Sequence, residues 1–165
     1  MPLSGLRTGG LYALVFRLRG VYSGPVGRRL YAALPPGLYL YVGTGWGPGG
    51  VAARLRRHMC GARRRLWWHI DYVASSPVYE PVAAVACLGA GRWLEPLFAA
   101  LFASSRLFEP LGAGLGGSDD PMGFGHFFAC IAGGVSACVG AAAGVAAGLP
   151  CLPRVVAGSP CRTGG

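Results

Sequence analysis

Hydrophobic and polar positions alternate along two early stretches of the chain, and this alternation predicts two β-strands. In residues 9–20, bulky side chains recur at every second position from Tyr12 onward, so they would share one face of a strand. In residues 37–43, Tyr39 and Tyr41 would share one face in the same way. We expect the two strands to be neighbours, with the hydroxyl groups of Tyr12 and Tyr41 on one face of a sheet.

The segment after the second strand cannot continue a regular element, because residues 44–50 (TGWGPGG) contain four glycines and one proline. Residues 51–58 then predict a helix, with Val51 and Leu55 on its buried side and with Arg54 and His58 elsewhere. Tyrosine hydroxyls, backbone N–H groups and guanidinium groups would meet near one point, which suits a phosphate group. The same layout is also a common structural connection, and its glycines match neither the dinucleotide fingerprint nor the P-loop.

The rest of the chain predicts further elements of both kinds. They are a third strand within 27–34, which we favour over a helical turn, a short helix over 66–76 docked by Trp67 or Trp68, a buried strand over 80–89, a helix over 91–108, a loop over 109–125 and a last strand over 125–131. Together they predict an α/β (α+β) fold, with a small, mainly antiparallel sheet of three to five strands flanked by about three helices.

We divide the chain into a domain at 1–131 and a Gly/Ala-rich C-terminal helix or tail at 132–165. Residues 127–149 carry no charge and are long enough to span a bilayer, but glycine and alanine contribute little transfer free energy. A packed small-residue helix or a poorly ordered tail is therefore favoured over a membrane span. We expect residues 150–165 to be loosely attached.

The charge balance favours a polyanionic partner, with nucleic acid the first candidate. The 165 residues include 15 basic and 6 acidic side chains, for a net charge of +9. Every basic residue is arginine, and the segment 54–65 is the most basic part of the chain. A planar guanidinium group can make two parallel hydrogen bonds to a phosphate. The alternative is a solvated arginine-rich face that reflects codon usage.

The six cysteines show no zinc-binding pattern, since no pair forms Cys-x-x-Cys and no histidine lies at zinc-finger spacing. The N-terminus is short, polar and glycine-rich, so we expect no signal peptide and a cytoplasmic chain. Cysteines in such a chain are usually buried thiols. Four of the six follow residue 129, which leaves a disulfide in the tail open.

Two short motifs resemble the halves of the GIY-YIG nuclease signature: Gly-Leu-Tyr at 10–12 and Tyr-Val-Gly at 41–43. The second motif leads into the predicted helix, where Arg54 lies on the first turn and His58 one turn later. Glu95 lies on a later helix after a buried strand, in the position of the family's metal-binding carboxylate.

A longer pattern resembles an archaeal branch of this superfamily that has no assigned function and is sometimes fused to endonuclease-III-type proteins. The resemblance covers roughly 9–131, and its segments are 39–58, WWHIDYV at 67–73, GGSDD at 116–120 and GHFF at 125–128. The gap between the two half-motifs is longer than in typical GIY-YIG nucleases, but a long hairpin is what this branch has. Asp119-Asp120 stands where the branch would have Asp-Cys, which puts the role of that loop in doubt.

The resemblance implies a Mg²⁺- or Mn²⁺-dependent endonuclease that acts on DNA, needs no small-molecule cofactor and leaves a 3′-hydroxyl and a 5′-phosphate. Tyr12 would deprotonate or position the attacking water with Tyr41 beside it, and Arg54 would hold the phosphate oxygens. His58 would orient the nucleophile or relay a proton, and Glu95 would bind the metal ion. Structure- or damage-directed cleavage in DNA repair is the expected activity.

Other residues would support the site. The expected nucleic-acid-binding residues are Arg56, Arg57, Arg63, Arg64 and Arg65. The expected site-shaping residues are Gly10, Gly43 and His69. His69 and Asp71 are two positions apart, so on a helix their side chains would point in different directions. We interpret both residues as structural, with His69 lining the cleft. His126 is favoured as a core residue and Asp119-Asp120 as turn-forming, with a second metal site as a minor option.

Each candidate also has a structural interpretation. Tyrosines are common strand residues, an arginine on a helix is usually solvated, and Glu95 would favour a helix N-terminus. The joint order and spacing of these residues favour a site. The main alternative function is a catalytically silent nucleic-acid-binding module on the same fold, and a third is a protein tethered to a membrane by residues 127–149.

Overall fold

The computed structural model describes residues 2–61, 65–112, 115 and 125–158. It has a mixed α+β fold built on a six-stranded antiparallel sheet with the strand order β6-β7-β4-β1-β5-β8. The strands are β1 (Gly10–Leu18), β4 (Gly37–Thr44), β5 (Tyr79–Leu88), β6 (Phe108–Pro110), β7 (Phe127–Cys130) and β8 (Pro153–Ala157). The predicted fold class is confirmed, although the sheet has more strands than the three to five expected.

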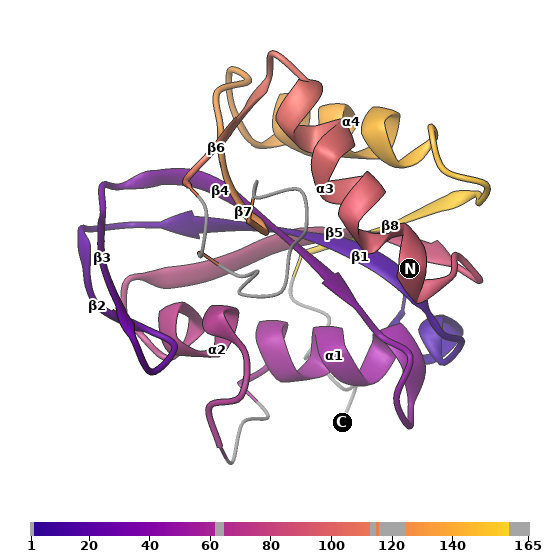
Figure 1. The fold of residues 1–165 in the computed structure, drawn as a ribbon, viewed down its shortest axis with the longest axis horizontal. Coiled ribbons are helices and arrows are strands. Elements are labelled where there is room, and N and C mark those ends of the chain that lie inside the picture. The colour runs from indigo at the N-terminus through magenta and orange to yellow at the C-terminus, as the bar shows by residue number, and fades with distance from the viewer. Residues whose placement is uncertain (1, 62–64, 113–114, 116–124, 159–165) are drawn as a thin grey trace.

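The other elements complete three layers. The helices are α1 (Gly50–Met59), α2 (His69–Ala74), α3 (Glu95–Ser104) and α4 (Val135–Ala146), with short 3-10 turns at Leu3–Leu6 (η1) and Arg92–Leu94 (η2). A separate hairpin consists of β2 (Tyr22–Val26) and β3 (Leu30–Leu34). Figure 1 shows α1 and α2 on one face of the sheet and α3 and α4 on the other.

The central strand β1 is buried on both faces, because alternate side chains enter two different cores. Tyr12, Leu14 and Phe16 pack with residues of α1 and α2. Leu11 and Val15 point to the opposite face and pack with residues of α3 and α4. This alternation follows from the two-residue period of a strand. Any side chain on the first face therefore lies between the sheet and α1, and this is where the candidate site is found.

The helix predicted over 91–108 is shorter than expected. The 3-10 turn η2 precedes it, and α3 ends at Ser104. Phe108 already belongs to β6, where its ring packs edge-on against Phe102 with the centroids 5.0 Å apart. Burial of Phe108 in the second core thus ends the helix before the end of the apolar run. The third strand, expected within 27–34, is confirmed as β3.

The C-terminal part is packed more tightly than expected. The predicted small-residue helix is confirmed as α4, whose Cys138, Ala142 and Ala146 are fully buried in the second core. The expectation of loose attachment is wrong for β8, which pairs with β5 from Ala83 to Cys87. The open edge of β5 offers hydrogen-bonding partners to β8. The sequence of the five-residue strand β8 does not by itself reveal this pairing. Within the described residues, no helix is both long enough and apolar enough to cross a bilayer.

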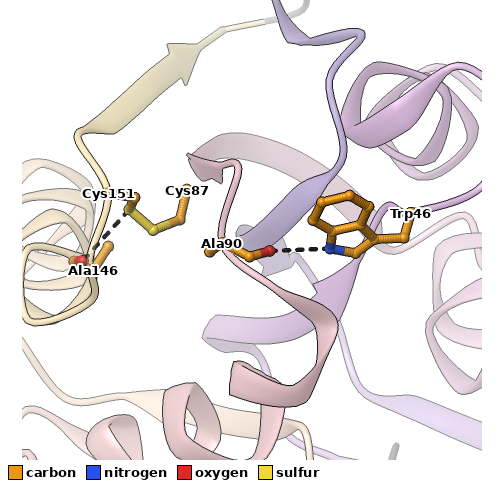
Figure 2. The surroundings of a disulfide bond; sticks show 5 residues. All are labelled: Trp46, Cys87, Ala90, Ala146 and Cys151. Atoms are coloured by element: carbon orange, nitrogen blue, oxygen red, sulfur yellow. Dashed lines mark hydrogen bonds between the residues drawn. A yellow bond between two sulfur atoms is a disulfide. The ribbon is translucent and has the colours of Figure 1, made fainter.

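Two disulfides also tie this part to the sheet. The expectation of buried thiols is therefore wrong for these four cysteines, and the alternative of a disulfide among the cysteines after residue 129 is confirmed. Cys87 of β5 is bonded to Cys151, as Figure 2 shows, and Cys130 of β7 is bonded to Cys138 of α4. The first bond closes a loop with a sequence separation of 64 residues. A crosslink that closes a loop of this length lowers the conformational entropy of the unfolded chain, and on this argument it stabilises the folded state by about 4 kcal/mol.

Candidate active site

Tyr12 and Tyr41 lie on neighbouring strands, with their rings on the face covered by α1. Tyr12 is paired with Gly43, and Leu14 is paired with Tyr41, so the two tyrosines are diagonal neighbours. Their ring centroids are 6.4 Å apart, and the residues are 2% and 4% exposed. A Cβ atom on Gly43 would lie 2.5 Å from both Cζ and the hydroxyl oxygen of Tyr12. Gly43 therefore makes room for the Tyr12 ring.

Gly10 has a different structural role. It pairs with Leu88 of β5, and a Cβ atom there would collide with the carbonyl oxygen of Cys87. Its missing side chain lets β1 and β5 approach at the end of the sheet nearest the site. Both glycines that were expected to shape the site thus have a steric reason to be glycine.

His58 lies on the buried side of α1, which differs from the expectation that it would point elsewhere. Its Nε2 atom is 3.0 Å from the hydroxyl oxygen of Tyr12. Its Nδ1 atom is 3.2 Å from Oδ1 of Asp71, a close polar contact that lacks the alignment of a hydrogen bond. The imidazole therefore stands between a hydroxyl group and a carboxylate, with almost no exposure to solvent.

Asp71 was interpreted as structural, and the structure places it at the centre of the polar cluster. It lies on α2 with its side chain fully buried. Its carboxylate accepts hydrogen bonds from Nε and Nη2 of Arg57, the shortest at 2.7 Å. The backbone N–H groups of Trp67 and Trp68 donate two more, at 2.9 and 3.1 Å. An acidic residue inside the apolar stretch 66–76 was the one sequence signal for this position.

These contacts fix the charge of Asp71. Burial alone would raise the pKa of its carboxyl group, but His58, Arg57 and the two backbone N–H groups together hold the pKa far below its usual range. Asp71 is therefore ionised, and the buried charge is balanced by the guanidinium group of Arg57. The cluster carries no uncompensated anion at this point.

His58 is neutral at neutral pH. Burial lowers the pKa of its imidazole, Asp71 partly opposes this effect, and the positive charges of Arg57 and Arg54 add to it. A neutral imidazole has one N–H donor and one acceptor nitrogen. With the proton on Nδ1, facing the carboxylate of Asp71, Nε2 is free to accept the hydroxyl proton of Tyr12.

Neither tyrosine is a phenolate at neutral pH. Burial raises the pKa of Tyr12 well above its usual value, and it likewise raises the pKa of Tyr41. The negative charge of Glu95 adds to both shifts, whereas Arg54 opposes them. The positive charge of Arg54 is thus too weak to ionise Tyr12, and a proton leaving this hydroxyl needs an acceptor such as His58.

Arg54 lies half-buried on the first turns of α1 and is held by stacking. Its Cζ atom is 3.9 Å from the centroid of the Trp68 ring, within the range of a cation–π interaction. A Cβ atom on Gly47 would lie 3.4 Å from one of its terminal nitrogens. The guanidinium group therefore stands between the glycine loop and Trp68, at the border of the tyrosine cluster.

Glu95 is the first residue of α3, and its Oε1 atom lies 3.4 Å from Nδ1 of His126. The ring of His126 in turn lies 6.4 Å from that of Tyr41, centroid to centroid. His126 was expected in the core and is instead mostly, not wholly, buried beside the site. Among the residues that the structure describes, no three His, Cys, Asp or Glu side chains gather closely enough to hold a metal ion.

The predicted nucleic-acid-binding arginines separate into three groups. Arg56 and Arg65 are exposed. Arg57 turns inward to Asp71 with its side chain only 15% exposed, which leaves little of it accessible to a phosphate backbone. Arg63 and Arg64 lie outside the described residues, as do Asp119 and Asp120.

His69 contacts the β2–β3 hairpin. A Cβ atom on Gly27 would lie 2.6 Å from Nε2 of His69, so its ring packs on the turn between β2 and β3. That turn needs glycine, since Gly27 has a φ of +78°. The structure thus gives His69 a role in seating the hairpin on α2.

Together, the fold and the site define a small α+β domain with a buried Tyr-His-Asp-Arg cluster between an antiparallel sheet and two helices. Residues 11–144 match the model of the family described as Domain of unknown function DUF123, and the chain belongs to this family. The match runs from β1 to α4 and includes every residue of the cluster. No curated protein and no solved structure matches the chain.

Proposed function

We propose that this protein is a metal-dependent endonuclease that hydrolyses DNA phosphodiester bonds, from the archaeal branch of the GIY-YIG superfamily that its motifs resemble. The observation that carries the proposal is the 3.0 Å contact between Nε2 of His58 and the hydroxyl of Tyr12, with Asp71 on the far side of the imidazole. Such an arrangement gives the tyrosine a proton acceptor, which a buried hydroxyl needs in order to act as a base.

In the proposed mechanism, a water molecule loses a proton to the hydroxyl oxygen of Tyr12 as Tyr12 passes its own proton to Nε2 of His58. The water oxygen bonds to phosphorus, the bond from phosphorus to the 3′ oxygen breaks, and that oxygen takes up a proton from solvent water to become a hydroxyl group. His58 then returns its proton to solvent through Tyr12. Asp71 stabilises the imidazolium of His58. Arg54, at the border of the cluster, would bind the phosphate oxygens as negative charge builds on them.

Glu95 fits the role of the single carboxylate that holds Mg²⁺ or Mn²⁺. Magnesium commonly uses one or two carboxylates and keeps several waters, so one partly exposed carboxylate is a sufficient protein ligand. The nearby Nδ1 of His126 would orient the carboxylate. When bound, the metal ion would neutralise charge on the phosphate and the leaving oxygen.

The charge of the chain supports a nucleic acid as the substrate. The net charge is +9, and exposed arginines such as Arg56 and Arg65 lie on and beyond α1. Each arginine that neutralises a phosphate releases counterions, so binding should weaken steeply as salt rises. Structure- or damage-directed cleavage in DNA repair is the form of the activity that we propose.

A catalytically silent nucleic-acid-binding module is the second candidate. It is favoured by the nearly complete burial of Tyr12 and Tyr41, which limits the access of water to their hydroxyls. In that case the Tyr-His-Asp-Arg cluster would stabilise the fold, and the surface arginines alone would carry the function.

The deciding experiment is cleavage of labelled duplex, flapped, branched, uracil-containing and abasic-site DNA with Mg²⁺, Mn²⁺ or EDTA. Wild type is compared with Glu95→Ala and with Glu109→Ala, a matched control on the exposed side of β6. We expect metal-dependent cuts in wild type and Glu109→Ala, none in Glu95→Ala, and equal DNA binding by all three. Full activity of Glu95→Ala would remove the metal role. A folded protein that binds but cuts no substrate would favour the silent module.

A further inference from the structure

Two exposed tryptophans, Trp46 and Trp93, contact two consecutive residues of the segment between β5 and α3. The indole N–H of Trp46, in the glycine loop after β4, donates a 3.0 Å hydrogen bond to the carbonyl oxygen of Ala90, as Figure 2 shows. Trp93 lies close to the backbone of Gly91, the next residue. Trp46 is 42% exposed and Trp93 is 77% exposed. Two large apolar side chains of this exposure, on two loops that meet at residues 90–91, form a candidate interaction surface.

Each ring rests with one face on a glycine. A Cβ atom on Gly9 would be almost equally close to three consecutive atoms of the six-membered ring of Trp46. The same holds for Gly91 and the ring of Trp93. A point in the plane of a ring, beyond its edge, cannot be equally close to three consecutive ring atoms, so each glycine lies over a ring face. The inner face of each indole is therefore covered, and its exposed area lies on the opposite face and edge.

These rings border the candidate active site and are accompanied by arginines. Arg54 lies next to Gly47, the residue after Trp46, and Arg92 is an exposed neighbour of Trp93. The segment that carries Trp93 continues directly into Glu95 at the start of α3. An arginine thus accompanies each ring, and the chain that carries Arg92 and Trp93 reaches the proposed metal ligand Glu95 two residues later.

We propose that Trp46 and Trp93 form a stacking platform for unpaired bases of a DNA strand. The substrate class is then DNA with a single-stranded segment next to the cleaved bond. Every base has a π face that can stack on an indole, and cationic side chains beside the rings bind the strand's phosphates. In a continuous duplex, the base faces are already stacked on one another and cannot reach the rings. The net charge of +9 argues for this polyanionic partner over an apolar protein segment.

This inference rests on the proposed DNA-directed function but is tested without cleavage. Fluorescence anisotropy in EDTA at low salt would measure binding of a labelled 12-nucleotide single strand, the matching duplex and a single strand of equal length with abasic sites. The variants are Trp93→Ala, Trp93→Phe and Trp46→Leu. Tyr31→Ala is the matched control, because Tyr31 is an aromatic residue of similar exposure (73%) on the separate β2–β3 hairpin.

We expect wild type to prefer the base-containing single strand over the abasic one. Trp93→Ala and Trp46→Leu should each weaken binding of that strand about tenfold and leave duplex affinity within about twofold. Trp93→Phe should keep most of the affinity, and Tyr31→Ala should match wild type. An equal loss on all three ligands, or no loss in either tryptophan variant, would overturn the platform.

The two proposals fail separately. Selective loss of single-strand binding in the tryptophan variants, with no cleavage of any substrate by wild type, would keep the platform and reject the nuclease. Metal-dependent cleavage that Glu95→Ala abolishes, with tryptophan variants that bind normally, would keep the nuclease and reject the platform.

Discussion

The Nε2 atom of His58 lies 3.0 Å from the hydroxyl oxygen of Tyr12, although the two residues are 46 positions apart in the chain. Tyr12 comes from the central strand of the sheet, and His58 comes from the last turn of α1. Asp71 of α2 extends the same row by contacting the other imidazole nitrogen. A hydroxyl, an imidazole and a carboxylate from three elements thus lie in one row, in which the imidazole can accept the proton of Tyr12 and the carboxylate can stabilise the resulting charge.

Replacing Tyr12 with phenylalanine removes only the hydroxyl group. We expect cleavage to fall by about a hundredfold or more, since loss of a general base commonly has an effect of this size. The free energy of unfolding should fall by about 1 kcal/mol, the typical net contribution of one hydrogen bond. Cleavage rates and urea unfolding measure the two effects.

Tyr39→Phe is the matched control for this change, because the Tyr39 hydroxyl donates a hydrogen bond to the carbonyl oxygen of Pro35, away from His58. It should show a similar loss of stability with unchanged cleavage. Equal cleavage by the two variants would mean that the Tyr12 hydroxyl has no part in the reaction.

The lowered pKa of His58 predicts the pH dependence of cleavage. Burial is the main cause of the shift, so the imidazole stays neutral to a lower pH than a free histidine, whose pKa is about 6.5. Because the neutral form accepts the proton of Tyr12, the acid limb of the kcat/KM profile should be centred below pH 6.5. Values of kcat/KM from about pH 4.5 to about pH 8 would give the midpoint of the acid limb, which is then compared with the ordinary histidine pKa.

Two variants assign this acid limb. His58→Gln should have low activity with no acid limb, whereas His69→Gln should keep the limb, since His69 packs on the hairpin turn at Gly27. A limb that persists in His58→Gln, or one centred above the ordinary histidine pKa, would show that another group titrates.

Asp71→Asn should destabilise the fold by about 3 kcal/mol at neutral pH, because it leaves the guanidinium group of Arg57 without its buried counter-charge. The folded pKa of Asp71 is depressed, so its contribution to stability is complete above the unfolded pKa and is lost as pH falls below about 4. The urea midpoint of wild type should therefore fall in acid, and that of Asp71→Asn should fall less.

Glu80→Gln is the comparison for this effect. The pKa of Glu80 is also lowered, chiefly by its hydrogen bond from Arg19, but this ion pair lies at the surface. Its loss should change stability much less than the loss of the buried pair, because exposed ion pairs contribute little. If Asp71→Asn had no larger effect than Glu80→Gln, the buried pair would contribute little to the fold.

The parts of the fold that could be predicted from sequence are those with a strong local signal. Alternation defined β1 and β4, and the glycine loop fixed the start of α1 at Gly50. The strand β8 could not be predicted, because its pairing depends on the open edge of β5, a non-local feature. The disulfide between Cys87 and Cys151 follows from the same pairing and was equally invisible to spacing arguments.

The site was partly predictable for a similar reason. Strand register brings Tyr12 and Tyr41 together, and helical spacing carries His58 toward them. The roles of Asp71 and Arg57 depend on how α1 packs against α2, because that packing brings the two charged groups of different helices into contact. Spacing along a single helix, which places Asp71 relative to His69, cannot reveal a partner on another helix.

Gly43→Ala tests the fit of the Tyr12 ring. The backbone of Gly43 has an ordinary φ, so the only cost is the new Cβ atom, which would lie 2.5 Å from the end of the Tyr12 ring. We expect a loss of about 1–3 kcal/mol in stability, the usual cost of overpacking, together with reduced cleavage as the ring is displaced from His58.

A double-mutant cycle with Tyr12→Leu tests whether the Tyr12 ring causes this loss. In the Tyr12→Leu background the end of the ring is absent, so Gly43→Ala should cost little stability. Urea unfolding of all four proteins should then give a coupling free energy similar in size to the loss caused by Gly43→Ala alone. Gly140→Ala is the control, since a Cβ atom there meets no atom within 4 Å and alanine favours the α4 helix. Equal losses in both backgrounds would place the clash of Gly43 somewhere other than Tyr12.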